Sequence, residues 1–179
     1  EAIVPPIGPP MTANAVALTG ATPVFADIDP ESCCITEDSI IDCFGVKTAG
    51  VIVVNLFGNT CKIPEWQPVI EDCAQSLSAL RGDIACYSFE QSKHICTGDG
   101  GMVVTNDPFL AKKVRQWSDH GMSNLTAGDG RWKGPAEFCF AGYNFRMPEL
   151  SAALGVAQLS SVKGGKTYIT EYIEDDKKA

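Results

Sequence analysis

The sequence predicts an α/β fold in which a mostly parallel sheet is flanked by helices. Short β-rich runs alternate with helical stretches along the chain, which is the pattern of repeated strand–helix units. The continuous apolar run from Gly50 to Leu56 is typical of a strand that is covered on both faces. With 179 residues, 45% of them hydrophobic and 20% charged, the chain has the composition of one ordinary globular domain.

The individual elements follow from local signals. Gly20 is suited to end the first helix, Thr36 to cap the second, and Pro148 to occupy the first turn of the longest one. Leu150, Leu154 and Ala157 are expected to line one face of that last helix. We expect strands near 2–4, 23–28, 50–56, 68–70, 84–89 and 102–105, and helices at 12–18, 36–44, 108–117 and 148–162.

Charge and hydropathy limit the domain organisation and the classes of function. We expect residues 1–162 to form the domain and residues 163–179 to form a linker and tail that is free to be mobile. No apolar run approaches the roughly 18 residues of a membrane helix, and no signal-peptide pattern opens the chain. The net charge of −8 argues against nucleic-acid binding, which needs a basic surface.

The cysteines indicate a reducing compartment. Eight cysteines stand mostly in apolar segments of a chain that is too large to need a disulfide framework. There is no CxxC pair and there are only two histidines, so no metal site is expected. Buried free thiols and a cytoplasmic location are therefore predicted.

A first candidate for chemistry is Asp72, which ends an apolar strand in the segment 69–76. A carboxylate there is costly unless it has a cationic partner, and a protonated pyridine nitrogen is such a partner. Taken alone, Asp72 fits better as the N-cap of a helix that follows the strand.

A second candidate is Lys93, which stands beyond an apolar strand and before a glycine-rich turn at 98–101. A partly desolvated lysine is a nucleophile for an aldehyde. Ser88 and Ser92 place hydroxyls where a phosphate can be held, and the glycines let the backbone approach a ligand. Without the flanking pattern, Lys93 fits better as an exposed lysine in a polar loop.

A third segment, 142–150, leads into the longest helix and by itself reads as a loop with a helix cap. Together, the three segments resemble the DegT/DnrJ/EryC1/StrS family, the sugar aminotransferases of the fold type I superfamily. The resemblance covers most of residues 1–162. Its most specific parts are Glu71-Asp72-Cys73-Ala74-Gln75, Ser88-Phe89 with Lys93 and Gly98-Asp99-Gly100-Gly101, and Gly142-Tyr143-Asn144-Phe145-Arg146-Met147.

The resemblance implies a role for each matching residue. Lys93 would hold pyridoxal 5'-phosphate covalently and move the proton of transamination, and Asp72 would pair with the pyridine nitrogen. Gln75 would lie against the ring and its 3-hydroxyl, and Ser88 would bind the phosphate. Asn144 would reach the phosphate of the neighbouring subunit in a homodimer. The implied substrates are a keto-sugar, nucleotide-linked in this family, and glutamate or glutamine as amino donor.

The chain also departs from the family pattern. Pro9 stands where the family usually has an aromatic ring, and the stretches 60–68 and 76–83 are short. An earlier phosphate-cupping segment and the C-terminal domain are not in the sequence, so the resemblance implies a partial large domain. A non-catalytic remnant that pairs through the family dimer surface is the alternative function. A dehydratase is disfavoured because Lys93 is present.

Overall fold

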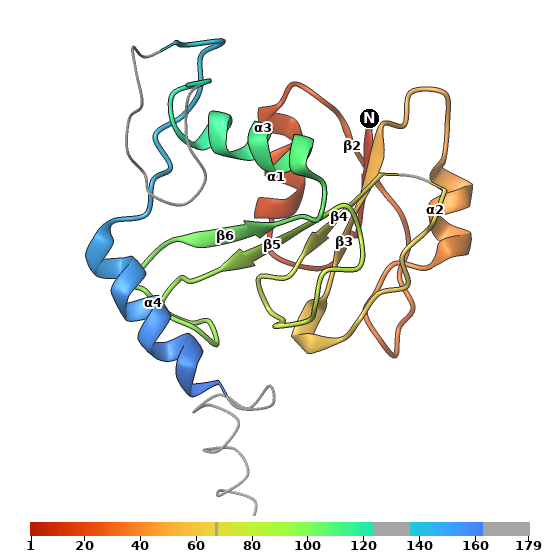
Figure 1. Ribbon diagram of the computed structural model, residues 1–179. Coiled ribbons are helices and arrows are strands. Elements are labelled where there is room, and N and C mark those ends of the chain that lie inside the picture. The colour runs from red at the N-terminus through yellow and green to blue at the C-terminus, as the bar shows by residue number, and fades with distance from the viewer. Residues whose placement is uncertain (67, 124–136, 163–179) are drawn as a thin grey trace, which may run out of the picture.

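The computed structural model describes residues 1–66, 68–123 and 137–162. Its centre is one six-stranded sheet with the order β2-β1-β3-β4-β5-β6. Strands β1 to β5 pair in parallel, and β6 runs antiparallel to β5, which confirms the predicted mostly parallel sheet (Figure 1). The strands are β1 (Ala2–Val4), β2 (Pro23–Phe25), β3 (Gly50–Val54), β4 (Val69–Asp72), β5 (Ile84–Ser88) and β6 (Gly101–Val104).

Four α-helices flank the sheet, each at a position expected from the sequence. The side chain of Thr36 accepts a hydrogen bond from the backbone N–H of Ser39, so the predicted N-cap is confirmed. In Figure 1, α1 and α3 lie above β5 and β6, and α4 lies below them. The helices are α1 (Met11–Leu18), α2 (Glu37–Cys43), α3 (Pro108–Ser118) and α4 (Glu149–Ser161).

The hydrophobic core lies where β1, β3 and β4 meet the segment around α2. Ile3, Ile40 and Val53 are fully buried, and Val51 and Val69 are 1% exposed. All but Ile40, which lies in α2, come from strands that the apolar runs predicted. Burial of this set fixes the middle strands of the sheet, and with them the places where those strands end.

Two of the connections between parallel strands contain no α-helix. After β3 the chain makes one short 3-10 turn, Leu56–Gly58, before β4, and residues 73–83 between β4 and β5 form turns only. Parallel strands are usually joined by a helix packed on the sheet. Both short connections were expected from the sequence, and other contacts must hold them in place.

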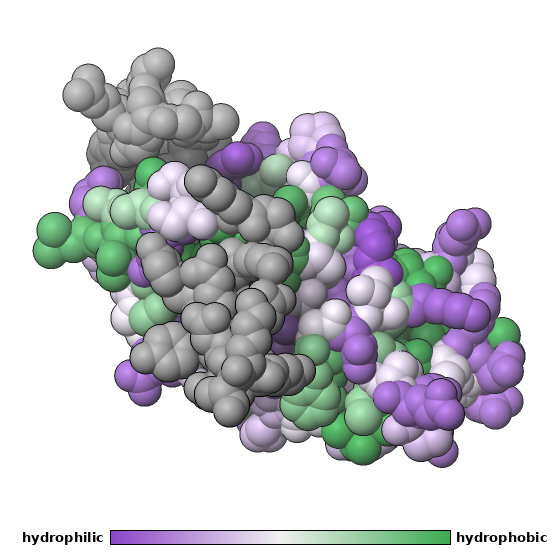
Figure 2. All heavy atoms as spheres, turned by 90° about the horizontal axis from the view of Figure 1, so that it is seen from below, coloured by the Kyte–Doolittle hydropathy of each residue, from purple (hydrophilic) through white to green (hydrophobic). Residues whose placement is uncertain are grey.

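The described surface is mixed in character. The face in Figure 2 shows hydrophilic and hydrophobic residues interspersed outside the grey atoms, as on most globular proteins. All eight cysteines are free thiols, but only Cys34, Cys61 and Cys73 are buried and Cys139 is exposed, so the prediction of buried thiols is right for only part of the set. No helix within the described part of the chain is long and apolar enough to cross a membrane. The described residues also contain no group of three or more His, Cys, Asp or Glu side chains that could hold a metal ion.

Candidate active site

The candidate site lies at the carboxyl end of the parallel strands. In open α/β sheets this is the edge where ligands bind, because the connecting loops meet there. The loops that follow β3, β4 and β5 contribute Phe57, Gln75 and Lys93 to one pocket of about 330 Å³. That volume is at the lower end of the range of roughly 300–1,000 Å³ for small-ligand sites. The remaining lining residues are Ala74, Ser92 and His94.

Lys93 lies in the long loop that joins β5 to β6. The loop is closed at its base by a hydrogen bond of 2.9 Å from Phe89 N to Gly100 O. Gly98 and Gly100 have φ of 86° and 124°, a backbone region that side chains disfavour, so glycine is needed at both positions. Lys93 N donates to Glu90 O at 3.0 Å in a turn, and the Lys93 side chain is half-buried at the pocket.

Asp72 is the last residue of β4 and its carboxylate is held on both oxygens. Thr12 Oγ1 donates to Oδ2 at 2.7 Å, and the backbone N–H of Ala74 donates to Oδ1 at 3.0 Å. Because no helix follows, Asp72 caps a turn, and the helix N-cap interpretation is wrong. Burial, and then the negative charge of Asp72, raise the pKa of the neighbouring Cys86 thiol to about 11.

The Asp72 carboxylate retains capacity for a cationic partner. Two ionised oxygens offer about four lone-pair positions, and two of them are used. Within residues 1–66, 68–123 and 137–162, no lysine, arginine or histidine forms an ion pair with it. A protonated ring nitrogen supplied by a ligand would meet the charge of this group.

Gln75 is oriented by the loop on the other side of the pocket. Phe57 N donates to Gln75 Oε1 at 3.2 Å, which fixes the amide so that its NH2 group is left for a ligand. Phe57 has a left-handed backbone with φ of 55° and is 74% exposed. The pocket therefore combines an amide donor, an amine and an aromatic side chain.

Other predicted site residues do not line this pocket. Ser88 ends β5, where its Oγ accepts from Glu90 N at 3.4 Å, so its hydroxyl proton remains available to a ligand. Asn144 is exposed and lies opposite Asp119 in an isolated antiparallel bridge. Pro9 precedes α1 and does not contribute to the lining either. The structure thus brings Gln75 and Lys93 together and places Asp72 and Ser88 at the ends of adjoining strands.

Sequence reasoning missed several residues of this region. It gave no role to Thr12, although a hydroxyl in the first turn of α1 reaches Asp72 across 60 positions. It gave none to Glu71, the buried neighbour of Asp72, or to Arg81, which pairs with it. The available signal was the presence of a second carboxylate in a buried strand with one nearby arginine, since buried charges are usually paired.

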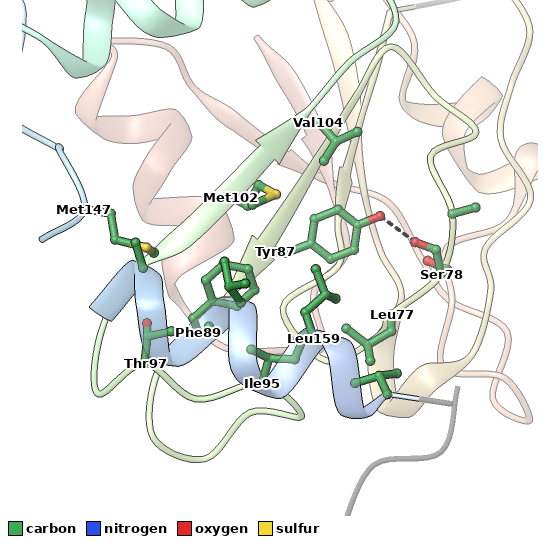
Figure 3. A pocket seen from close by; sticks show the side chains of 15 residues that line it. Leu77, Ser78, Tyr87, Phe89, Ile95, Thr97, Met102, Val104, Met147 and Leu159 are labelled. Carbon is green, nitrogen blue, oxygen red and sulfur yellow. Dashed lines mark hydrogen bonds between the residues drawn. The ribbon is translucent and has the colours of Figure 1, made fainter. Parts of the chain in front are cut away.

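A larger cavity of about 530 Å³ lies between α4 and the strands β5 and β6. Figure 3 shows that Tyr87, Phe89, Met102 and Leu159 point into it. It shares no lining residue with the Lys93 pocket. Its side chains are almost entirely apolar, so it lacks the groups that polar chemistry requires.

Comparison with known proteins identifies the family of the chain. Residues 1–168 match the model of the DegT/DnrJ/EryC1/StrS aminotransferase family. GDP-perosamine synthase of Escherichia coli O157:H7 is 34% identical over 175 residues, which are 89% of this chain and 46% of that protein. Spore coat polysaccharide biosynthesis protein SpsC of Bacillus subtilis is 35% identical over 179 residues, with 89% and 46% covered.

A solved structure shows the same relationship. The aminotransferase from Psychrobacter cryohalolentis superposes with a TM-score of 0.79 at 34% identity, over 90% of this chain and 46% of that one. The chain therefore spans about half the length of the relatives that it matches. The family model covers nearly the whole chain, and the chain belongs to the DegT/DnrJ/EryC1/StrS aminotransferase family.

Proposed function

We propose that this chain is the cofactor-binding part of a pyridoxal-phosphate aminotransferase. It transfers an amino group from glutamate or glutamine to a nucleotide-linked keto-sugar. The observation that carries the proposal is the pocket at the carboxyl edge of the sheet, where Gln75 and Lys93 meet on the loops that follow Asp72 and Ser88. The family is pyridoxal-phosphate-dependent, and a relative of this chain is named for a GDP-linked amino sugar.

Each residue has a distinct task in this proposal. Lys93 Nζ would hold the cofactor through its aldehyde carbon and would carry the proton of transamination between that position and the amino-bearing carbon of the substrate. Asp72 orients the ring through its free lone pairs, with Thr12 holding the carboxylate in place. Gln75 directs its NH2 group to the ring oxygen, and Ser88 donates to the phosphate. Pyridoxal phosphate, when bound, supplies the electron sink for the carbanion at that carbon.

The proposal includes a homodimer in the cytoplasm. Asn144 is exposed and lies outside its own chain's pocket, which supports a role for it at the phosphate of a second subunit. Eight free thiols support a reducing compartment.

The experiment that tests the proposed function is chemical trapping. The purified chain is mixed with pyridoxal phosphate, reduced with borohydride, digested and mapped by mass spectrometry. A reduced cofactor adduct is expected on Lys93, and K93A should abolish it while K113A, which removes an exposed lysine of α3, leaves it unchanged. An adduct spread over several surface lysines, or none at Lys93, would reject the assignment.

A further inference from the structure

A second carboxylate lies behind the pocket and has no role in the chemistry proposed above. The side chain of Glu71 is completely buried. Its Oε1 accepts from the backbone N–H groups of Arg81 at 2.6 Å and Gly82 at 2.8 Å. Its Oε2 accepts from Arg81 Nη2 at 2.6 Å and Asn55 Nδ2 at 3.2 Å. Four donors thus converge on one carboxylate in the interior.

The same donors reach into a second loop. Arg81 Nη1 donates to Cys61 O at 2.7 Å, and Arg81 Nη2 also contacts Asn55 Oδ1 at 3.2 Å. Asn55 Oδ1 accepts in addition from Cys61 N at 3.1 Å. Asn55 and Cys61 belong to the connection after β3, whereas Arg81 belongs to the connection after β4. Glu71 is therefore the centre of a network that ties the two connections together.

These two connections form one wall of the Lys93 pocket. Phe57 comes from the first connection and Gln75 from the second, and the hydrogen bond from Phe57 N to Gln75 Oε1 joins them at the pocket. Neither connection has an α-helix to pack it against the sheet. The backbone of Phe57 is left-handed, a conformation that persists only where the surroundings impose it. The Glu71 network is a buried contact that spans both connections, beside the bonds that Asn55 Nδ2 donates to Cys73 Sγ at 3.3 Å and Ser78 Oγ at 3.1 Å.

We propose that Glu71 is a positioning residue of the cofactor pocket, which holds Gln75 and Phe57 in place through Arg81 and Asn55. That this pocket binds a cofactor rests on the proposed function. The positioning itself does not, because it concerns the shape of the pocket wall in the free protein. A purely stabilising ion pair would raise the stability of the whole fold without a special effect on the Phe57–Gln75 contact.

The first test measures amide hydrogen exchange by NMR on the full chain without cofactor. In E71Q one acceptor oxygen becomes an NH2 donor. This donor faces the N–H groups that bonded the carboxylate, so the hydrogen bonds at that position are lost. The amide of Phe57, which does not touch Glu71, should then exchange roughly two- to tenfold faster, the range for one lost hydrogen bond. The amide of Val53 in β3 reports global opening, so its exchange should speed up only by the factor that the loss of global stability sets, which differs from the factor at Phe57. R81K is a second variant, since a lysine keeps the charge but cannot bond Cys61 O and Glu71 together.

Two controls make the result decisive. E37Q is the same substitution in α2, at a carboxylate that accepts one side-chain hydrogen bond within the described residues, from Trp66 Nε1, and it should leave Phe57 unchanged. In a Q75A background, E71Q should add nothing at Phe57, because the acceptor is already gone. Unchanged exchange at Phe57 in both E71Q and R81K overturns the proposal. Equal acceleration at Phe57 and Val53 overturns it too, because Glu71 then acts on stability alone.

A cofactor titration separates this inference from the proposed function. If the wild-type chain binds pyridoxal phosphate, E71Q should bind more weakly, and the loss should vanish in the Q75A background. Equal affinity of wild type and E71Q overturns the positioning role. If the wild-type chain binds none, the proposed function fails, and the exchange at Phe57 alone decides whether Glu71 positions the wall.

Discussion

At the scale of single residues, the site depends on two adjacent carboxylates with opposite surroundings. Asp72 is half-buried, accepts hydrogen bonds from two neutral donors and keeps lone pairs for a ligand. Glu71 is completely buried and forms an ion pair with Arg81. One β-strand therefore turns Glu71 into the interior and places Asp72 at the carboxyl edge, because consecutive side chains leave a strand on opposite faces. This alternation explains why only one of the two carboxylates keeps lone pairs for a ligand.

The charge of Asp72 should be more important than its shape. D72N keeps an oxygen that accepts from Thr12 but removes the negative charge. We expect the dissociation constant for pyridoxal phosphate at neutral pH to rise about tenfold or more, since one pKa unit on the ring nitrogen corresponds to about 1.4 kcal/mol. Absorbance titration measures this, with D99N in the exposed turn before β6 as the matched control. Equal affinities of D72N and D99N would contradict the pairing.

Glu71 should make the fold sensitive to acid. Burial works to raise the pKa of Glu71, but hydrogen bonds from the Gly82 and Arg81 amides and from the Asn55 and Arg81 side chains outweigh it and lower the pKa below its ordinary value. A lowered pKa stabilises the fold above the unfolded-state value of about 4.3 and loses that contribution as the pH falls through the folded-state value.

Urea unfolding from neutral to acid pH measures this dependence. The free energy of unfolding of the wild-type chain should fall through the acid range, and that of E71Q should fall less steeply. At neutral pH, E71Q should be less stable by about 3 kcal/mol, the lower end for a broken buried pair, because the Arg81 side chain is 33% exposed. If the free energy of unfolding fell equally steeply with decreasing pH in both proteins, Glu71 would not be the titrating group.

At the scale of elements, α4 is attached to the loop that carries Lys93. Gln158 Oε1 accepts from Cys96 N at 2.8 Å, and Gln158 Nε2 donates to Cys96 O, so one amide pairs with both backbone groups of one residue. Gly155 packs on the same loop, with its virtual Cβ position 3.0 Å from Thr97 Cγ2. No residue of α4 is buried, so these few contacts decide where the helix sits.

Removal of this amide should loosen the Lys93 loop. Q158L has a similar volume but leaves both backbone groups of Cys96 without their partner. We expect a loss of about 2 kcal/mol in the free energy of unfolding, about 1 kcal/mol for each hydrogen bond. Urea unfolding measures it, and S160A is the control because its hydroxyl bonds only within α4, to Ala157 O. A Q158L protein as stable as S160A would show that α4 is held by other contacts.

At the scale of the whole molecule, the sequence predicted the elements better than their contacts. The sequence predicted the alternation of strands and helices, the Thr36 N-cap and the short connections, because each depends on residues that are close together in the chain. The Thr12–Asp72 bond and the Glu71–Arg81 pair were not, because they join residues that only the folded sheet brings together. The predicted roles of Asp72, Gln75, Ser88, Lys93 and Asn144 all stay predictions. The division at residue 162 also stays a prediction, because 163–179 lie outside the described residues.

The proposed dimer makes a prediction about mixtures of inactive chains. K93A lacks the amine that holds the cofactor, and N144A lacks the group proposed to reach the partner's phosphate. If sites are shared between subunits, a mixed dimer contains one intact site, built from Lys93 of the N144A chain and Asn144 of the K93A chain. Cofactor affinity should therefore be restored in a fraction of the sites after the two proteins are mixed and reassembled. Affinity that stays at the level of N144A would contradict sharing.

The central claim is that Lys93, Gln75 and Asp72 form one pyridoxal-phosphate site at the carboxyl edge of the sheet. The most direct measurement is a crystal structure of the chain grown with pyridoxal phosphate. Continuous electron density is predicted from Lys93 Nζ to the cofactor, with the ring nitrogen at Asp72 and the Gln75 amide at the ring oxygen. Cofactor density at another place, such as the apolar cavity beneath α4, with a free Lys93 side chain, would contradict the account.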